Sequence, residues 1–305
     1  MPNPLLTNRQ LGPDVARANL LTNGGFENWQ RGNGPFTAAG AWTADRWALS
    51  AQGSDTLSVN KDTANVDAGS GACAAVTSTL GTGAGSTSYN QPIKATDAPE
   101  IAGRTLTFSV RIRVATANAV RMGIYNGTAW TYGAFHTGSG VYQTLSATTT
   151  FGASGTFYVA VYFAASCTAY IDNAMLVVGS QPANYVPLHP ADDLARCLRY
   201  YELLNPGAEG PYLFLGQAAG TAAVYAPVLY RVQKPVTPSV TMSAASSFGA
   251  SNVAMSTQPI TSATPSIITR VSCQGAFATS GMTGGSASVI LATNGTCQIS
   301  IEANP

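Results

Sequence analysis

Hydrophobic and polar residues alternate over much of the chain, as they do in a β-strand with one buried face. In Arg104–Ala115 (RTLTFSVRIRVA), Leu106, Phe108 and Val110 fall on one face and Arg111 falls on the other. The segments between such stretches are rich in Gly, Asn and Ser, which is typical of turns. Six further strands are predicted: Asp55–Lys61, Ala72–Ser78, Ala119–Tyr125, Tyr142–Thr150, Thr156–Ala164 and Ala169–Val178. The pattern therefore predicts an antiparallel two-sheet β-sandwich over residues 19–187.

The pattern changes near residue 181. Gln181–Pro190 contains three Pro and is typical of a linker, and Ala191–Leu204 (ADDLARCLRYYELL) then has helical spacing. Asp192 and Asp193 lie in its first turn, where carboxylates interact favourably with the helix dipole. Later runs predict a second, smaller β domain: Tyr212–Leu215, Ala222–Val232, Ser239–Ser243, Ile267–Ser272, Ser286–Ala292 and Thr296–Glu302. The expected division is an N-terminal arm (1–18), the sandwich (19–187), and the helix with the second domain (188–305).

One face of the predicted helix carries apolar residues, among them Leu194, Leu198 and Tyr201. Two interpretations are open. The face closes the core of the second domain, or it packs around a threefold axis against the same helix of other chains. No sustained heptad is present, so a contact of the second kind would be short.

Aromatic residues gather in Asn19–Trp47, which reads NLLTNGGFENWQRG, a glycine-rich gap, and AWTADRW. Neither a helical nor a two-residue period organises them. We therefore expect an irregular wrap that plugs one end of the β-core, with glycines at its tight turns. The aromatic residues are Phe26, Trp29, Phe36, Trp42 and Trp47, and the glycines are Gly24, Gly25 and Gly32.

The composition limits the classes of partner. Only 10% of the 305 residues are charged, so Ser, Thr, Asn and Gly must supply the polar surface, as in β-rich extracellular or particle-associated proteins. The net charge of +1 gives no electrostatic basis for binding nucleic acid or an anionic membrane. No apolar run approaches the roughly eighteen residues of a membrane span. The first twenty residues lack the apolar core of a secretory signal.

The five Cys have no CxxC spacing, and their odd number prevents a closed set of disulfides within one chain. The first interpretation is that they are buried free thiols that act as small hydrophobic residues. The alternative is a Cys273–Cys297 bridge, because both lie in strand-like runs of the same C-terminal segment.

Catalytic chemistry is not expected. The chain has two His, His136 and His189, and lacks the GxSxG, HExxH and P-loop patterns. A glycosidase needs two carboxylates that face each other across a cleft, and so few charged residues disfavour such a pair. We therefore predict that the protein is not an enzyme.

Several segments, taken in order, resemble one family. NLLTNGGFENWQRG followed by WTADRW resembles the opening of the carbohydrate-binding-module family 4/9-like jelly roll of bacteriophage tail fibre and appendage proteins. AYIDNAMLVVGSQPANYVP resembles its closing strand, and HPADDLARCLRYY resembles the helix that follows it there. Gly216-Gln217 and the segment from Lys234 to Val240 also fit, so the resemblance covers residues 19 to 243. It implies a β-sandwich of the jelly-roll kind, and the last sixty residues carry no motif of the family. With the strand-like runs described above, the expected fold is all-β: an N-terminal jelly roll, one linking α-helix and a smaller C-terminal β domain.

A carbohydrate-binding face is predicted from exposed aromatic and amide side chains. Sugar rings stack on aromatic rings, while amide groups form hydrogen bonds with the hydroxyls. The candidates lie in GTAWTYGAF and STSYNQP, which are expected to be turns. The alternative is that the two aromatic residues of the first segment only cap the edge of the sandwich. The candidate residues are Trp130, Tyr132, Tyr89, Asn90 and Gln91.

The resemblance also implies a structural calcium ion. In the resembled modules an acidic residue of the Gly-Phe-Glu turn and an Asp of the last strand hold calcium, and the matching positions are Glu27 and Asp172. Carboxylate oxygens suit this ion. The alternative is that Glu27 caps a turn and that Asp172 pairs with Arg46 or Arg31.

The resemblance and the composition together predict a phage virion structural protein, located at the particle surface or tail. Its expected work is adhesion to a host surface glycan, with other copies of itself (a homotrimer) and other virion proteins as partners. One alternative is a head or baseplate decoration protein that binds only virion proteins. The other is a carbohydrate-binding accessory module of a secreted glycan-active system.

Overall fold

The computed structural model describes residues 18–81, 87–94, 101–204, 212–252, 254 and 256–304. The predicted arm at residues 1–18 lies almost wholly outside them. The chain divides into two compact units, with unit 1 ending at Cys197 and unit 2 comprising Leu198–Asn304. The boundary falls ten residues later than predicted, so most of the linking helix belongs to unit 1.

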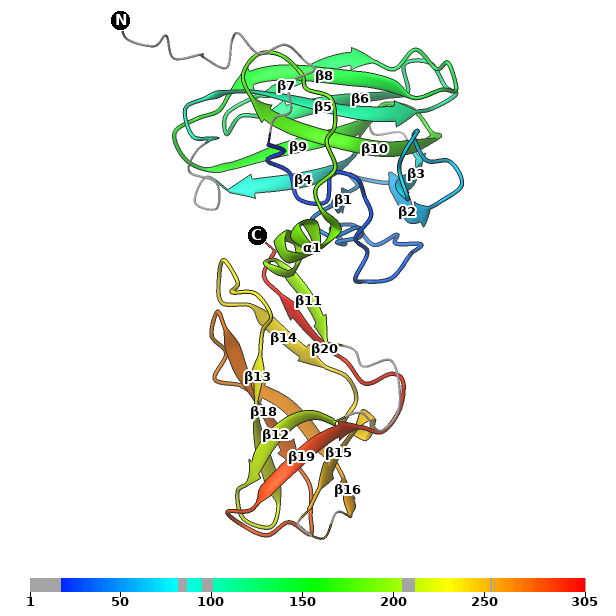
Figure 1. Cartoon of the computed structure of the whole chain (residues 1–305). Helices are drawn as coiled ribbons and strands as arrows, with labels where there is room; N and C mark the ends of the chain where they lie inside the picture. Colours follow the sequence, from blue (N-terminus) through cyan, green and yellow to red (C-terminus); the bar gives the residue numbers. More distant parts are fainter. Residues whose placement is uncertain are drawn as a thin grey trace, which may run out of the picture. The chain divides into compact units, whose positions relative to one another are not determined.

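Unit 1 consists of two antiparallel five-stranded sheets, which are drawn in the upper part of Figure 1. This is the β-sandwich of the jelly-roll kind that the sequence predicts, in a chain that is nearly all β. The first sheet has the order β1 (Ala48–Ser50), β4 (Ser88–Lys94), β9 (Thr156–Phe163), β6 (Val120–Tyr125) and β7 (Trp130–Phe135). The second has the order β2 (Thr56–Asp62), β3 (Cys73–Thr79), β10 (Cys167–Val178), β5 (Thr105–Arg113) and β8 (Gln143–Thr150).

The core of unit 1 lies between the two sheets. On β5, Leu106, Phe108 and Val110 are fully buried, as their alternation predicts. Phe157 and Val159 of β9, from the other sheet, belong to the same core. Three strands of unit 1 were not predicted. They are β1, which follows directly on Trp47, and β4 and β7, which fall in the segments that were expected to be turns.

The aromatic wrap closes one end of this core. Phe26 and Trp47 are fully buried with ring centroids 4.8 Å apart, and the Tyr89 ring lies 5.4 Å from that of Trp47. Trp29 is also buried and Phe36 packs against the core, whereas Trp42 is half-buried. Burying large aromatic side chains is the main favourable term that such an irregular segment can offer. The expected plug is therefore present.

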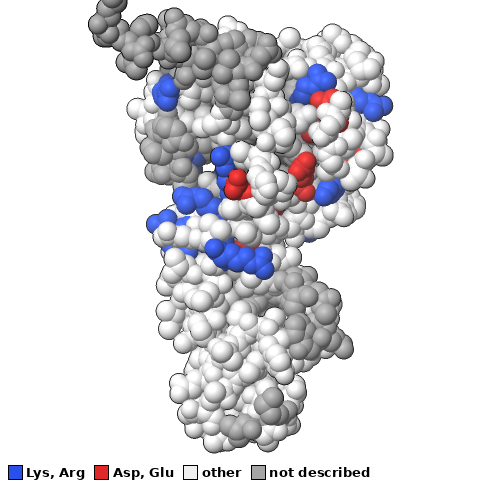
Figure 2. All heavy atoms as spheres, viewed as in Figure 1, with Lys and Arg blue, Asp and Glu red and all other residues white. Residues whose placement is uncertain are grey.

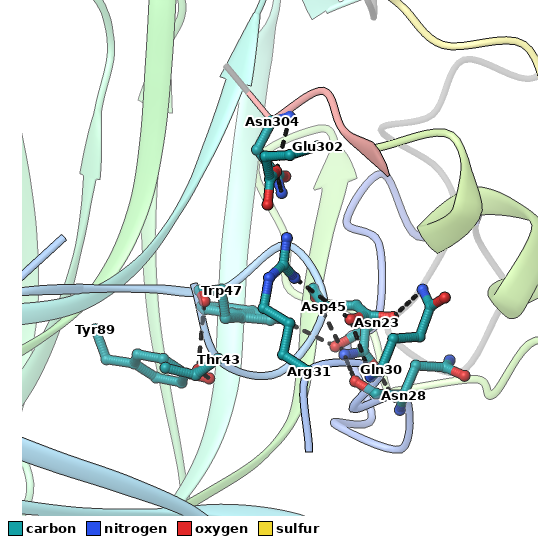
Figure 3. Close-up of polar contacts among 10 residues, drawn as sticks. All are labelled: Asn23, Asn28, Gln30, Arg31, Thr43, Asp45, Trp47, Tyr89, Glu302 and Asn304. Atoms are coloured by element: carbon teal, nitrogen blue, oxygen red, sulfur yellow. Dashed lines mark hydrogen bonds and ion pairs between the residues drawn. The ribbon is translucent and has the colours of Figure 1, made fainter. Parts of the chain in front are cut away.

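Asn23 fixes the path of the wrap, and Figure 3 shows it among its partners. Its side chain donates to the carbonyls of Asn28 (2.9 Å) and Asp45 (3.1 Å) and accepts from the amide of Asn28 (3.0 Å). Its own carbonyl accepts from the indole nitrogen of Trp47 (3.1 Å). Asn23 has a left-handed backbone (φ 54°), which Asn tolerates better than most residues. At Gly24 the chain passes so close to Ala174 that a Cβ would lie 2.3 Å from its carbonyl oxygen.

The helix α1 (Pro190–Leu198) is shorter than the predicted Ala191–Leu204. Its expected last turn is instead the strand β11 (Tyr201–Leu204), which pairs with β20 (Ile299–Glu302). Asp193, in the acidic first turn of the helix, accepts hydrogen bonds from the amide of Asn23 (3.0 Å) and the side chain of Asn28 (2.8 Å). The first turn of α1 therefore anchors the wrap.

Unit 2 contains a three-stranded and a seven-stranded antiparallel sheet (Figure 1). The first has the order β11, β20 and β14 (Ser239–Met242). The second has the order β16 (Thr257–Pro259), β15 (Phe248–Ser251), β19 (Ala287–Ala292), β12 (Tyr212–Ala218), β13 (Ala223–Leu229), β18 (Ser272–Ala278) and β17 (Ser262–Ser266). A 3₁₀ turn, η3 (Ala245–Ser247), precedes β15. Most of the predicted strand Ile267–Ser272 is instead the hairpin connection between β17 and β18, and its last residue begins β18.

All five cysteines are free thiols, four of them buried and Cys167 half-buried. The first interpretation, buried free thiols, is confirmed for four of the five, and Cys273 and Cys297 are not bridged. Among the described helices none is long and apolar enough to cross a membrane.

Candidate functional site

The first sheet of unit 1 carries a row of aromatic side chains on the face turned away from the core. Strand β9 reads TFYVAVYF, and its Phe157, Val159 and Val161 are buried in the core. Successive side chains of a strand point to opposite faces. Tyr158 and Tyr162 therefore lie on the outer face.

The register brings further rings to the same face. Tyr125 of β6 is the partner of both Tyr158 on β9 and Trp130 on β7. Gly123 of β6 is the partner of Tyr132 on β7. The five rings come from three adjacent strands, and we call them the aromatic platform: Tyr125, Trp130, Tyr132, Tyr158 and Tyr162.

The rings of the platform contact one another. Trp130 and Tyr132 are almost parallel, with an interplanar angle of 16° and centroids 6.1 Å apart. Each meets Tyr162 edge to face at 5.1 Å. Gly123 lies beneath them, and a Cβ there would lie 2.9 Å from the Tyr132 ring. The glycine therefore permits the rings to lie close to the sheet, with Tyr132 still 37% exposed.

Two polar side chains border the platform. The guanidinium carbon of Arg121 lies 3.8 Å from the centroid of Tyr132, which is cation–π stacking. Asn90 of β4 is half-buried and pairs with Ala160, which pairs in turn with Gly123. Asn90 therefore lies on the outer face in the same row as Tyr132, and its partner Ala160 lies between Tyr158 and Tyr162 on β9.

The structure separates the predicted binding residues. Trp130, Tyr132 and Asn90 share the outer face, but Tyr89 and Gln91 point into the core and are corrected here. The Tyr89 hydroxyl bonds to the hydroxyl of Thr43 (2.8 Å), as Figure 3 shows. Gln91 accepts from the amide of Thr22 (3.0 Å) and donates to its carbonyl (2.8 Å). Both side chains are structural, because neighbours on a strand alternate between the two faces.

The two carboxylates at the expected calcium site differ in burial and in their partners. Asp172 is fully buried, and its oxygens accept from the amides of Asp67 (3.0 Å) and Asn173 (2.7 Å). Glu27 is exposed. Calcium takes six to eight oxygen ligands, and the described residues contain no group of three or more His, Cys, Asp or Glu that could hold a metal. Any calcium ion held by Glu27 and Asp172 would need backbone carbonyls for its remaining ligands, and it stays a prediction from the resemblance.

The suggested pairing of Asp172 with Arg46 or Arg31 also differs from the contacts observed. Arg31 lies 3.6 Å from the carboxylate of Asp45, and Arg46 donates to the carbonyl of Pro92 (2.6 Å). Asp172 instead supports Asp67, which holds Arg111 through two hydrogen bonds of 2.7 and 3.0 Å.

Burial raises the pKa of Asp45 to about 6, although Gln30 and Arg31 oppose the shift. A carboxyl group whose pKa is higher in the folded state than in the unfolded state stabilises the fold fully at any pH below its unfolded-state pKa. That stabilisation is lost as the pH rises from the unfolded-state pKa to the folded-state pKa. We expect the wild type to lose stability relative to Asp45→Asn between about pH 4 and pH 6, by roughly 1.4 kcal/mol for each step of one in pH. Urea unfolding of both proteins across this range measures the difference. A difference that stays constant with pH would contradict it.

The platform offers ring faces, one cation and one amide, with no nucleophile or pair of facing carboxylates among its residues. Such a surface can stack flat, weakly polar ligands and bond to their hydroxyls. Residue patterns named Trp130, Tyr132 and Asn90 in advance but missed Tyr158, Tyr162 and Arg121. The alternation in β9 was the available signal, because it separates two tyrosines from the apolar core residues.

No protein-family model matches the sequence, and no curated protein matches it. Among solved structures, the chain is similar to the CBM22-1 xylan-binding domain of Paenibacillus barcinonensis Xyn10C, with 13% identity over 55% of this chain and 99% of that one, and a TM-score of 0.38. The chain is also similar to TmCBM61 in complex with β-1,4-galactotriose, with 14% identity over 53% of this chain and 99% of that one, and a TM-score of 0.34. A third similar structure is the enzymatically active domain of bacteriophage CBA120 tailspike protein 4, with 13% identity over 53% of this chain and 21% of that one, and a TM-score of 0.34. Scores of this size carry no inference about ligand or activity.

Proposed function

We propose that the protein binds glycans through the aromatic platform and does not cleave them. The observation that carries the proposal is the set of five aromatic rings on the outer face of one sheet, each in contact with at least two of the others. A core does not require these rings, because the opposite face of the same strands already supplies it. Stacked rings bordered by Arg121 and Asn90 match the needs of a sugar ring, which has an apolar C–H face and a polar rim.

On the sequence resemblance, we further propose that the setting is a bacteriophage surface appendage or tail fibre and that the bound glycan belongs to the host surface. The motifs between residues 19 and 243 support this proposal. Presentation as a homotrimer among other virion proteins would make weak single sites effective, because linked copies raise the effective concentration. The same binding face would also serve an accessory module of a secreted glycan-active system.

A glycan array tests the proposed function. We expect the whole chain to bind a defined set of sugars, and Trp130→Ala and Tyr132→Ala to reduce that signal by about tenfold or more, because each removes a stacking surface. Tyr170→Ala is the matched control, since Tyr170 is a half-buried tyrosine on β10 of the other sheet.

Circular dichroism and urea unfolding must show that each variant retains its fold. A blank array for the wild type would overturn glycan binding and favour the decoration role, with only virion proteins as partners. Equal signals from the wild type, Trp130→Ala and Tyr132→Ala would show that the platform is not the binding face.

A further inference from the structure

Unit 2 has a groove of about 460 Å³ against the outer face of its seven-stranded sheet. Its floor comes from β12, β13 and β18, and one wall comes from the hairpin between β17 and β18. A volume of this size lies within the range of roughly 300–1,000 Å³ found for small-ligand sites. The lining residues on which the argument rests are Gln217, Tyr225, Pro227, Ile267 and Gln274.

The strand register places an aromatic ring between two amides. Gln217 on β12 is the direct partner of Tyr225 on β13, and Pro227 on β13 is the partner of Gln274 on β18. Tyr225 and Gln274 are therefore diagonal neighbours, within reach of a shared ligand. The neighbouring residues Val224 and Ala226 are buried, which directs Tyr225 outward, where it is 41% exposed.

The polar groups of the groove have unused hydrogen-bonding capacity. The Oε1 of Gln274 accepts from the Ser266 hydroxyl (3.1 Å), and no bond within the described residues engages its Nε2 or the hydroxyl of Tyr225. Gln217 donates to the carbonyl of Gly285 only at 3.4 Å. Each amide therefore keeps at least one N–H donor and one oxygen lone pair for a ligand, which is the combination that vicinal hydroxyls require.

Among the described residues, no charged side chain lines the groove. Arg270, in the adjoining hairpin, donates to the carbonyl of Lys234 (2.8 Å) and is not part of the lining. Charge is scarce throughout this unit, and Figure 2 shows an uncharged surface over its seven-stranded sheet on the face turned to the viewer. An ionic ligand would find no partner here, so the groove suits an uncharged one.

The hairpin wall contains a strained residue. Ile267 has a left-handed backbone (φ 45°), which is rare for a β-branched residue, and its side chain is 72% exposed. Burial therefore does not account for the strain. The amide and hydroxyl of Thr269 bond to the carbonyl of Ser272 (2.8 and 2.9 Å), and these bonds hold the turn in place. Strain of this kind concentrates at ligand sites.

We propose that this groove is a second binding site, separate from the aromatic platform, and that it takes an uncharged carbohydrate. The ring of Tyr225 provides the stacking surface, Pro227 and Ile267 provide apolar walls, and the amides of Gln217 and Gln274 bind hydroxyls. A peptide that adds to a sheet edge is not the expected ligand, because β12, β13 and β18 are each paired on both sides.

The test uses the whole chain with Trp130→Ala, so that the platform does not mask the groove. Titration calorimetry with the hexaoses of cellulose, xylan, mannan and β-1,4-galactan is the measurement. We expect at least one hexaose to bind, and the further change Tyr225→Ala to weaken it about tenfold or more. Tyr212→Ala is the matched control, because Tyr212 is 68% exposed on β12 and does not line the groove.

The second site is overturned if the Trp130→Ala protein binds none of the four hexaoses, or if Tyr225→Ala and Tyr212→Ala behave alike. If Trp130→Ala removes all the binding of the wild type, the groove proposal fails and the platform proposal stands. If binding survives Trp130→Ala and is lost with Tyr225→Ala, the groove stands. The platform fails only if the wild type and the Trp130→Ala protein bind every sugar equally well. A Tyr225-dependent preference for sialyllactose over the neutral sugars would overturn the uncharged assignment.

Discussion

Replacing Trp47 with alanine is expected to lower the free energy of unfolding of unit 1 by about 3–5 kcal/mol, the range for removing a large aromatic side chain from a core. Trp47 is fully buried, and its ring contacts those of Phe26 and Tyr89. The loss has a second component, because the indole nitrogen donates to the carbonyl of Asn23 (3.1 Å). Without the indole, that carbonyl stays buried without this donor.

Trp42→Ala is the matched control, since Trp42 belongs to the same segment but is only half-buried. The guanidinium carbon of Arg46 lies 5.9 Å from the centroid of the Trp42 ring, and a cation–π contact of this kind contributes little to stability. Urea unfolding followed by circular dichroism compares the two variants, with the slope of the transition checked for each. Equal losses from Trp42→Ala and Trp47→Ala would show that the wrap does not close the core as the contacts indicate.

The alternation of apolar and polar residues was sufficient to predict the strands of unit 1 that have one clearly apolar face. It failed at β4, whose segment SYNQP contains Pro92 and resembles a turn. The structure explains the exception. Strand β1 pairs with β4 only as far as Asn90, so at Pro92 one side of β4 has no partner strand among the described residues. A missing N–H is tolerated at such an edge.

The end of the helix could not be read from local spacing. Tyr201 and Leu204 continue the apolar face of the preceding turns, yet they form β11, in register with Glu302 and Ile299 of β20. That pairing joins residues about a hundred positions apart, and tertiary contacts of this kind override local propensity. The hairpin at Ile267 was missed because its apolar residues resemble those of a strand, whereas its backbone forms a turn.

The candidate platform was only partly predictable. Trp130 and Tyr132 drew attention because a core strand rarely contains such a Gly-flanked aromatic pair. Tyr158 and Tyr162 of β9 come close to them because β9 and β7 are the two neighbours of β6 in the sheet. Strand order is a long-range property, and the spacing of residues along one strand does not contain it.

The second large effect is expected in unit 2, where Lys234→Met should lower the free energy of unfolding by about 3–5 kcal/mol. The side chains of Lys234 and Glu202 are both fully buried, and Nζ donates to a carboxylate oxygen of Glu202 at 2.8 Å. Nζ also donates to the carbonyl of Leu198. Removing the cation leaves the carboxylate buried, and the side chain of Arg231, which is 62% exposed, then faces it from 3.9 Å.

The double variant Lys234→Met with Glu202→Gln separates the loss of charge pairing from the loss of packing. The amide side chain that Glu202→Gln introduces is neutral and could still accept from the backbone amide of Arg231, which bonds to Glu202 at 3.1 and 3.2 Å. We therefore expect the double variant to be more stable than Lys234→Met alone, although it carries an additional substitution. Urea unfolding at pH 7 compares the two variants. A double variant less stable than Lys234→Met would show that the buried charge is not the source of the loss.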